Sequence, residues 1–83
     1  MGELSALPNI SKVIEEKLNA VGISSMEQLR QQGSKEAFTK IWLKDHTACI
    51  NMLMAIEGAI EGVRWHHISE EKKAELKGFY NGL

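Results

Sequence analysis

Apolar residues recur every three or four positions along most of this chain, which is the spacing of one face of an α-helix. The pattern marks five segments: 11–21, 25–32, 35–43, 47–62 and a last one that begins after Ser69. Glycine or serine stands at most of their boundaries, and these residues commonly end or begin helices. The pattern therefore predicts an all-α fold of five helices joined by short connections.

The first segment has two distinct faces. Its apolar positions are Ile10, Val13, Ile14, Leu18 and Val21, and its polar positions are Lys12, Glu15, Glu16 and Asn19. We expect the apolar face to be buried and the polar face to be exposed. Pro8 precedes this helix, where a missing amide does little harm, and Gly22 is expected to end it.

Serine residues mark the starts of the second and third helices. Ser24 with Glu27 fits a capping box, in which the serine hydroxyl accepts a hydrogen bond from an otherwise unpaired amide. Ser25 with Gln28 fits the same motif, and both alternatives stay open. Ser34 is expected to cap the third helix.

The segment 47–62 carries the broadest apolar stripe. Its members are Cys49, Met52, Leu53, Ile56, Ala59, Ile60 and Val63. This width predicts a central helix that is contacted on more than one side, with Cys49 as a small core residue. Gly58 and Gly62 interrupt the segment. Because glycine weakens a helix, we expect another backbone to approach closely there.

The composition is that of an ordinary folded domain. The 83 residues are 43% hydrophobic and 25% charged. We expect one domain over residues 1–83, a compact five-helix bundle of the helix-hairpin-helix or SAM-like type. No apolar run approaches the ~18 residues of a membrane span, and no secretion signal opens the sequence. We therefore expect a cytoplasmic protein without membrane contact.

The segment 7–11, Leu-Pro-Asn-Ile-Ser, has the outline of a helix-hairpin-helix motif. Such motifs hold a phosphate with the amides of a glycine-rich turn and of the following helix N-terminus. Here Asn9 and Ser11 occupy the glycine positions. Asn9 can adopt a left-handed conformation, and Ser11 can cap the helix with its own hydroxyl. Asn9, Ser11 and Lys12 are thus the candidate nucleic-acid contacts, and the alternative is a helix start anchored by the flanking leucine and isoleucine.

The charge balance weighs against strong DNA binding. Ten lysines and arginines stand against eleven acidic residues, which gives a net charge of −1. Non-specific DNA binding depends on a basic field that neutralises phosphates. We therefore expect any contact with duplex DNA to be weak.

Four residues invite a metal hypothesis: His46, Cys49, His66 and His67. A structural zinc site needs four ligands in recognisable pairs, whereas adjacent histidines point their side chains in different directions. We expect no metal and no other cofactor.

Two further sets of residues invite a functional interpretation. Glu57 and Glu61 are spaced for acid–base chemistry, but no nucleophile or phosphate loop accompanies them, so we expect pairing with a neighbour such as Arg64. Trp42 and Trp65 can stack on a base, but in so small a domain we expect both at the core or its edge. We expect neither an enzyme nor a small-molecule substrate.

Taken in order, several segments resemble the C-terminal domain of the TfoX/Sxy competence regulators. They are residues 7–11, 19–23 and 27–30 at its start, 51–65 as its central Ala-Leu-Glu-Gly-Ala helix leading to Gly-x-x-Trp, and 68–76 as its closing Leu-Pro-x-x-Lys-Lys-x-x-Leu. The sequence departs from this pattern at Ser11, where glycine is common, and at 68–69, where Leu-Pro is common. The resemblance covers nearly the whole chain, so we expect a stand-alone domain of this type.

The resemblance implies help in switching on genes for DNA uptake, with no catalytic residues assigned. We expect a non-enzymatic regulatory domain for competence, or DNA transformation, that acts through macromolecular contacts. The alternative is a protein-interaction or self-association module without DNA contact. Its partner is then a regulatory protein or a second copy of the chain.

Overall fold

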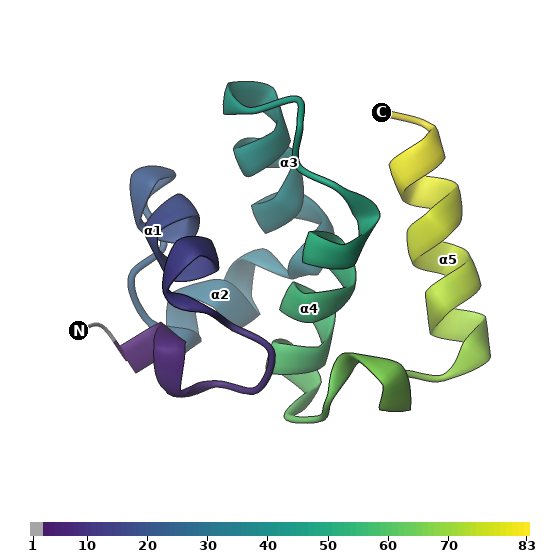
Figure 1. The fold of residues 1–83 in the computed structure, drawn as a ribbon, viewed down its shortest axis with the longest axis horizontal. Coiled ribbons are helices and arrows are strands. Elements are labelled where there is room, and N and C mark those ends of the chain that lie inside the picture. Colours follow the sequence, from purple (N-terminus) through teal and green to yellow (C-terminus); the bar gives the residue numbers. More distant parts are fainter. Residues whose placement is uncertain (1–2) are drawn as a thin grey trace.

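The computed structural model describes residues 3–83, which form five α-helices and two short 3-10 helices (Figure 1). Their order is η1 Glu3–Ala6, α1 Lys12–Ala20, α2 Met26–Gln32, α3 Ser34–Lys44, α4 Ile50–Glu61, η2 Trp65–His67 and α5 Glu70–Asn81. No β-strand occurs among residues 3–83. The prediction of an all-α, five-helix fold is confirmed.

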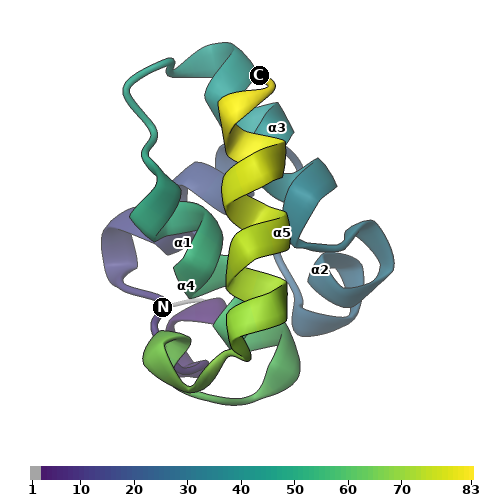
Figure 2. The same ribbon diagram turned by 90° about the vertical axis from the view of Figure 1, so that its right-hand side faces the viewer.

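Helix α4 lies at the centre of the arrangement. It packs against α2, α3, α5 and η2. In Figure 2, where α5 faces the viewer, α5 runs along the outside of the molecule and α4 lies behind it. Leu53, Ile56 and Ala59 of α4 are fully buried between these neighbours. The predicted central position of this helix is therefore confirmed.

The core is apolar and draws on almost every element. Its largest fully buried side chains are Phe38, Leu4, Leu18, Ile23, Leu29, Leu53, Ile56 and Leu76. The Cα radius of gyration is 11.5 Å, which is close to the value expected for a folded domain of this length. None of the helices described here combines the length and the hydrophobicity needed to cross a bilayer.

Serine hydroxyls begin three of the helices. The Ser11 hydroxyl accepts a hydrogen bond from the Ile14 amide at 3.2 Å, as predicted. Of the two alternatives for α2, the structure selects Ser25, whose hydroxyl accepts from the Gln28 amide at 3.1 Å. Ser69 caps α5 in the same way. Each contact satisfies an amide that has no partner within its helix.

The predicted cap of α3 is wrong. Gly33, with φ of 83°, is the N-cap residue, and its left-handed backbone favours glycine. Ser34 is the first residue of the helix and is buried. Its hydroxyl donates to Oε1 of Glu57 at 2.6 Å. The serine therefore joins α3 to α4 instead of capping its own helix.

The start of α4 also differs from the prediction. The helix begins at Ile50, and Cys49 is its exposed N-cap residue, so the predicted core position of this cysteine is wrong. A turn precedes the helix, in which Asp45 Oδ1 accepts from the Thr47 amide at 3.0 Å. This turn directs Ala48 into the core in place of Cys49.

The buried side of α1 differs from the prediction at two positions. Glu15, expected on the solvent side, is only 5% exposed, whereas Val13, expected in the core, is 58% exposed. The cause is η1, which packs beside α1. Its Ser5 amide donates to the Glu15 carboxylate at 3.1 Å. A carboxylate that accepts such a bond tolerates burial far better than an isolated one.

Candidate functional site around Trp65

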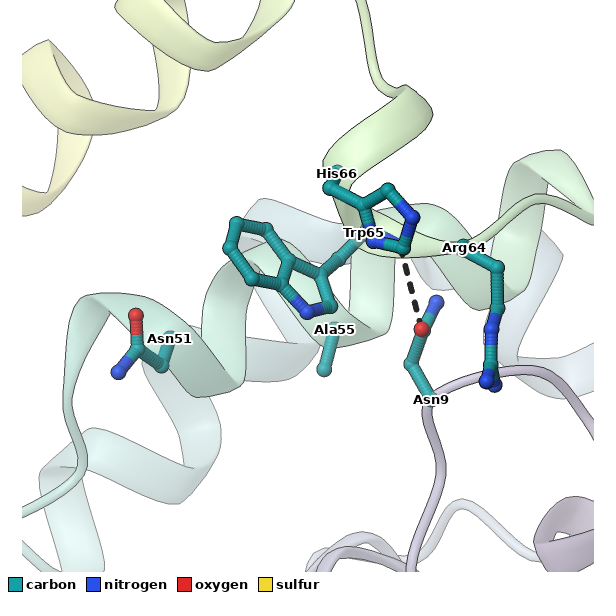
Figure 3. Close-up of a pocket in the computed structure, with 6 residues that line it drawn as sticks. All are labelled: Asn9, Asn51, Ala55, Arg64, Trp65 and His66. Atoms are coloured by element: carbon teal, nitrogen blue, oxygen red, sulfur yellow. Dashed lines mark hydrogen bonds between the residues drawn. The ribbon is translucent and has the colours of Figure 1, made fainter.

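The loop before α1 is fastened to the turn after α4 by the side chain of Asn9. Its Nδ2 donates to the Val63 carbonyl at 2.9 Å. Its Oδ1 accepts from the Trp65 amide at 3.1 Å, the bond that is dashed in Figure 3. Asn9 has φ of 69°, the left-handed conformation that the sequence allowed. One side chain thus holds together two segments that lie more than fifty residues apart in the sequence. We call this arrangement the Asn9 clamp.

Gly58 lies directly beneath the Asn9 clamp. A Cβ atom at this position would lie 2.5 Å from Asn9 Nδ2, 2.8 Å from the Val63 carbonyl oxygen and 3.2 Å from the Trp65 Cα. The predicted close approach of another backbone is confirmed here. The same prediction is wrong for Gly62, which follows the last residue of α4 in a left-handed conformation. A Cβ atom added to Gly62 would meet no atom within 4 Å. Helix α4 therefore uses its two glycines for different purposes.

A hollow of about 530 Å³ opens beside the clamp. It is lined by Asn9, Asn51, Ala55, Arg64, Trp65 and His66, and we call it the Trp65 pocket. Figure 3 shows the indole over Ala55, between Asn51 at one end and Asn9 with Arg64 at the other. Three of the lining residues, Arg64, Trp65 and His66, come from η2 and the position before it. Of these three, the sequence singled out only Trp65 as a candidate for aromatic stacking.

The exposure of Trp65 differs from the prediction. Its side chain is 47% exposed, so it lies outside the core. The reason is the turn itself: the Trp65 amide is held by Asn9, and three residues later Ile68 enters the core. Trp42, in contrast, is half-buried and stacks on His46 with ring centroids 4.3 Å apart. The two tryptophans therefore have different environments.

Basic groups surround the exposed indole. Lys73 Nζ lies 5.8 Å from the Trp65 ring centroid and donates to the His66 carbonyl at 3.3 Å. The His66 ring meets the indole edge to face, and Arg64 lies at the pocket rim. Glu70 lies 3.8 Å from Lys73 and is itself almost fully exposed. An aromatic surface with basic neighbours suits a partner that offers apolar groups and negative charge.

The three residues predicted to contact nucleic acid now have distinct positions. Asn9 lines the Trp65 pocket, but its amide group is engaged in the clamp. The Ser11 hydroxyl caps α1, and Lys12 is exposed at the first position of that helix. Ser11 and Lys12 lie outside the lining of the pocket. The structure thus brings one of the three to the pocket.

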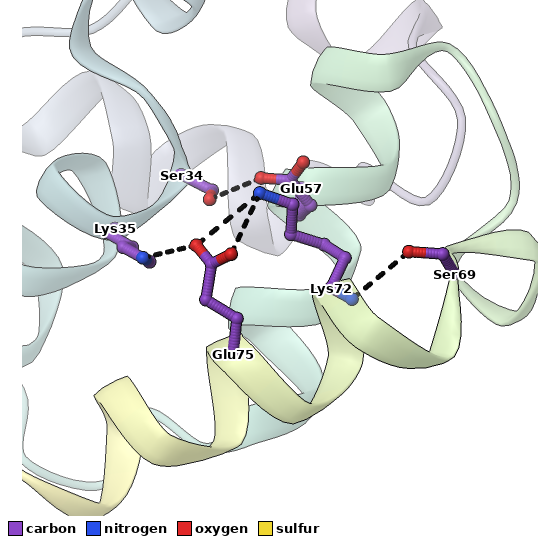
Figure 4. Close-up of polar contacts among 6 residues, drawn as sticks. All are labelled: Ser34, Lys35, Glu57, Ser69, Lys72 and Glu75. Atoms are coloured by element: carbon purple, nitrogen blue, oxygen red, sulfur yellow. Dashed lines mark hydrogen bonds and ion pairs between the residues drawn. The ribbon is translucent and has the colours of Figure 1, made fainter.

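A second polar cluster joins α3 to α5 (Figure 4). Lys35 forms an ion pair with Glu75, and Lys72 lies 3.4 Å from the same carboxylate. We call these three residues the α5 ion cluster. Beside it, Glu57 accepts from the Ser34 hydroxyl. The expected neighbouring partner of Glu57 or Glu61 is thus Ser34, bound to Glu57, and not Arg64.

The charges of this region shift two pKa values in opposite directions. The hydrogen bond and attraction from Lys35, with a contribution from Lys72, lower the pKa of Glu75. A hydrogen bond with Glu57, then desolvation and the repulsion of that carboxylate, raise the pKa of Glu61. Neither carboxylate lies at the Trp65 pocket.

The four residues of the metal hypothesis do not gather into one ligand set. His46 stacks on Trp42, whereas His66 and His67 meet edge to face with ring centroids 4.5 Å apart. Within residues 3–83, no three side chains of histidine, cysteine, aspartate or glutamate gather closely enough to hold a metal ion.

Comparison with known proteins gives a family and two solved structures. The family model described as the TfoX C-terminal domain matches residues 1–80. Two crystal structures from Listeria monocytogenes contain chains that are each 49% identical in sequence to this one. The first is an uncharacterized protein in a triclinic form, with a TM-score of 0.94; the match covers 95% of this chain and 90% of that chain. The second is a protein of unknown function in a tetragonal form, with a TM-score of 0.92; the match covers 94% of this chain and 96% of that chain. No curated protein matches the chain.

Proposed function

Because the chain belongs to the TfoX C-terminal domain family, we propose that it is a non-enzymatic regulatory domain that acts by binding another macromolecule in the cytoplasm. The Trp65 pocket is its contact surface. The observation that carries this proposal is the exposed indole of Trp65 at the rim of a 530 Å³ hollow. Tryptophan and arginine are the residues that most often dominate protein interfaces. The resemblance to competence regulators extends the proposal to the control of DNA uptake.

The chemistry of the pocket favours a protein as the partner. Arg64, His66 and Lys73 place basic groups around an apolar ring, which complements a protein surface with carboxylates and apolar side chains. The amide of Asn9 is already used within the fold, and the net charge of the chain is −1. A duplex DNA backbone requires a larger excess of positive charge for tight binding.

Weak contact with duplex DNA is the second candidate, and it rests on the start of α1. Lys12 is exposed there, beside Asn9 and Ser11. The Ser11 hydroxyl accepts from the amide of Ile14, which is one of the four first-turn amides that have no partner within a helix. A phosphate can therefore still meet the N-terminus of this helix and the Lys12 ammonium.

A crosslinking experiment in the native cell tests the protein partner. A photoreactive amino acid at His66, on the pocket rim, is expected to capture one dominant protein, whereas the same group at the exposed Glu16 of α1 is not. Trp65→Ala is expected to abolish the His66 crosslink and to lower the transformation frequency while the protein stays folded by circular dichroism. Equal crosslinking from both positions, or a crosslink that survives Trp65→Ala, would overturn the proposal.

A titration tests the DNA candidate separately. Fluorescence anisotropy of labelled duplex DNA is measured against the protein at several salt concentrations. Weak binding that falls steeply with salt, with a smaller slope for Lys12→Ala, supports phosphate contact. Absence of binding at low salt eliminates this candidate and leaves the protein partner unaffected.

A further inference from the structure

A second hollowed surface lies between the end of α1 and the C-terminal half of α3, two helices that pack against each other (Figure 1). Two adjoining hollows of about 420 and 140 Å³ share Ala20, Val21 and Lys44. Their remaining lining residues are Lys17, Lys40, Ile41, Leu43 and Asp45. We call this surface the Leu43 groove. None of its residues lines the Trp65 pocket.

The apolar lining of the groove includes a leucine that the core does not use. Leu43 is 65% exposed, although its helix buries Phe38 and Ile41 on the other side. Val21 is half-buried beside it, and Ala20 is exposed. A leucine this exposed, at the edge of a hollow with apolar neighbours, offers a site for one apolar side chain of a partner.

The rim of the groove carries an excess of positive charge. Three lysines and one aspartate line it, a local balance of +2 in a chain of net charge −1. The aspartate, Asp45, is already paired with Lys17 at 2.9 Å. Lys44 donates to the Ala20 carbonyl at 3.0 Å, and Lys40 donates to Gln32 Oε1 at 2.7 Å. These neutral oxygens hold the two ammonium groups in place and leave their charge uncompensated.

We infer that the Leu43 groove binds an acidic amphipathic segment of a partner protein. An apolar side chain of that segment lies against Leu43 and Val21, and flanking carboxylates meet Lys40 and Lys44. This is the arrangement by which a helix with an apolar stripe docks into a groove. The inference goes beyond the proposed function, because it assigns a second surface with its own partner chemistry.

Other partners fit the groove less well. A DNA backbone presents charge without apolar side chains, so it leaves Leu43 uncovered. A membrane surface favours an apolar face that projects outward, whereas Leu43 borders a hollow. An acidic amphipathic segment complements both the apolar lining of the groove and the lysines at its rim.

Selection from a random peptide library displayed on phage tests the inference with the protein as it is. Selected peptides are expected to combine a leucine-like residue with glutamate or aspartate, and to be lost on Leu43→Ser. Val13→Ser is the matched control, because Val13 is also an exposed apolar residue on a helix but lies outside the groove. Recovery of basic or uncharged peptides, no enrichment, or equal selection by the Leu43→Ser protein would each overturn the inference.

A selected peptide then gives the quantitative test by fluorescence anisotropy. Leu43→Ser is expected to weaken its affinity at least about tenfold, the cost of uncovering one leucine contact. The affinity of the unaltered protein is expected to fall as salt is added. Replacing Lys40 and Lys44 by glutamate is expected to abolish binding. The control pair replaces the exposed Lys12 and Lys77, which changes the net charge equally and leaves binding intact.

Two further results would contradict the inference. Equal losses from the two lysine pairs would reduce the effect to overall charge. Sedimentation across a concentration series that shows a dimer dissociated by Leu43→Ser would assign the groove to a second copy of the chain instead. Trp65→Ala is expected to leave peptide binding unchanged, so a failure here is distinguishable from a failure of the proposed function.

Discussion

Two polar connections hold distant parts of this fold together, and they are built from different chemistry. The Asn9 clamp is neutral, is directed at the backbone and joins the loop before α1 to the turn at Trp65. The α5 ion cluster is charged, is formed by side chains alone and joins α3 to α5. Both span long separations in the sequence. Of the two, only the Asn9 clamp lies in direct contact with a glycine, Gly58.

The difference shows which connection fixes the candidate site. Backbone carbonyl and amide groups cannot move away from Asn9 without moving the turn itself, so the clamp determines where Trp65 lies. Long lysine and glutamate side chains at an exposed surface exchange partners readily, and such ion pairs contribute little to stability. We therefore expect the shape of the Trp65 pocket to depend on Gly58 and Asn9, and the α5 ion cluster to adjust stability only slightly.

The largest effect is expected for Gly58→Ala. The added methyl would overlap Asn9 Nδ2 and the Val63 carbonyl oxygen, so the clamp must open or the turn must shift. Overpacking of this kind costs about 1–3 kcal/mol. The measurement is the free energy of unfolding by chemical denaturation, together with the fluorescence of Trp65 in a Trp42→Phe background as a report on the turn.

Gly78→Ala is the matched control for this substitution. Gly78 also lies in a helix, α5, and a Cβ atom there would meet no atom within 4 Å. Alanine is favoured over glycine inside a helix, so this variant should gain about 0.5–1 kcal/mol. If both variants gain stability, the close approach at Gly58 does not constrain the turn.

A smaller loss is expected for Asn9→Ala. It removes both hydrogen bonds of the clamp and leaves alanine in a left-handed conformation that it adopts poorly. Because water can reach this edge, we expect a loss of about 1–2 kcal/mol. Asn51→Ala, on the exposed side of the same pocket, should change stability little. An equal effect of the two substitutions would contradict the clamp.

The helical pattern of the sequence was sufficient to predict the five helices and the central place of α4. Apolar spacing reports which positions a helix can bury, and here it agreed with the core at Leu18, Leu53, Ile56 and Leu76. Local rules also sufficed for the Ser11 cap and the left-handed Asn9, because both depend on a few neighbouring residues.

Errors arose where residues outside the helix concerned decide the outcome. Glu15 is buried because Ser5 offers it an amide, and Cys49 is exposed because the Asp45 turn sends Ala48 inward. The candidate site has the same origin. Periodicity along α4 cannot show that Asn9 holds the turn in a position that leaves Trp65 exposed.

A still smaller effect, dependent on pH, is expected for Glu75→Gln. Lys35 and Lys72 lower the pKa of Glu75 in the folded state, so its ionised form stabilises the fold above the ordinary pKa of 4.5. That contribution is lost as the pH falls from this value through the lowered pKa of the folded state. The substitution should therefore lower the thermal unfolding midpoint slightly at neutral pH and leave it unchanged in acid. High salt should also remove the difference.

The smallest effect has the opposite sign and is expected for Glu61→Gln. Glu57 raises the pKa of Glu61 in the folded state, so protonation of Glu61 favours the fold. This contribution is complete below the ordinary pKa of 4.5 and is lost as the pH rises through the raised value, where the two carboxylates repel each other. Glu61→Gln should thus raise the unfolding midpoint slightly at neutral pH and have no effect in acid. Glu16→Gln, an exposed change in α1, provides the baseline. If Glu61→Gln and Glu75→Gln shift the midpoint in the same direction at neutral pH, the opposite electrostatic roles assigned to these two carboxylates are wrong.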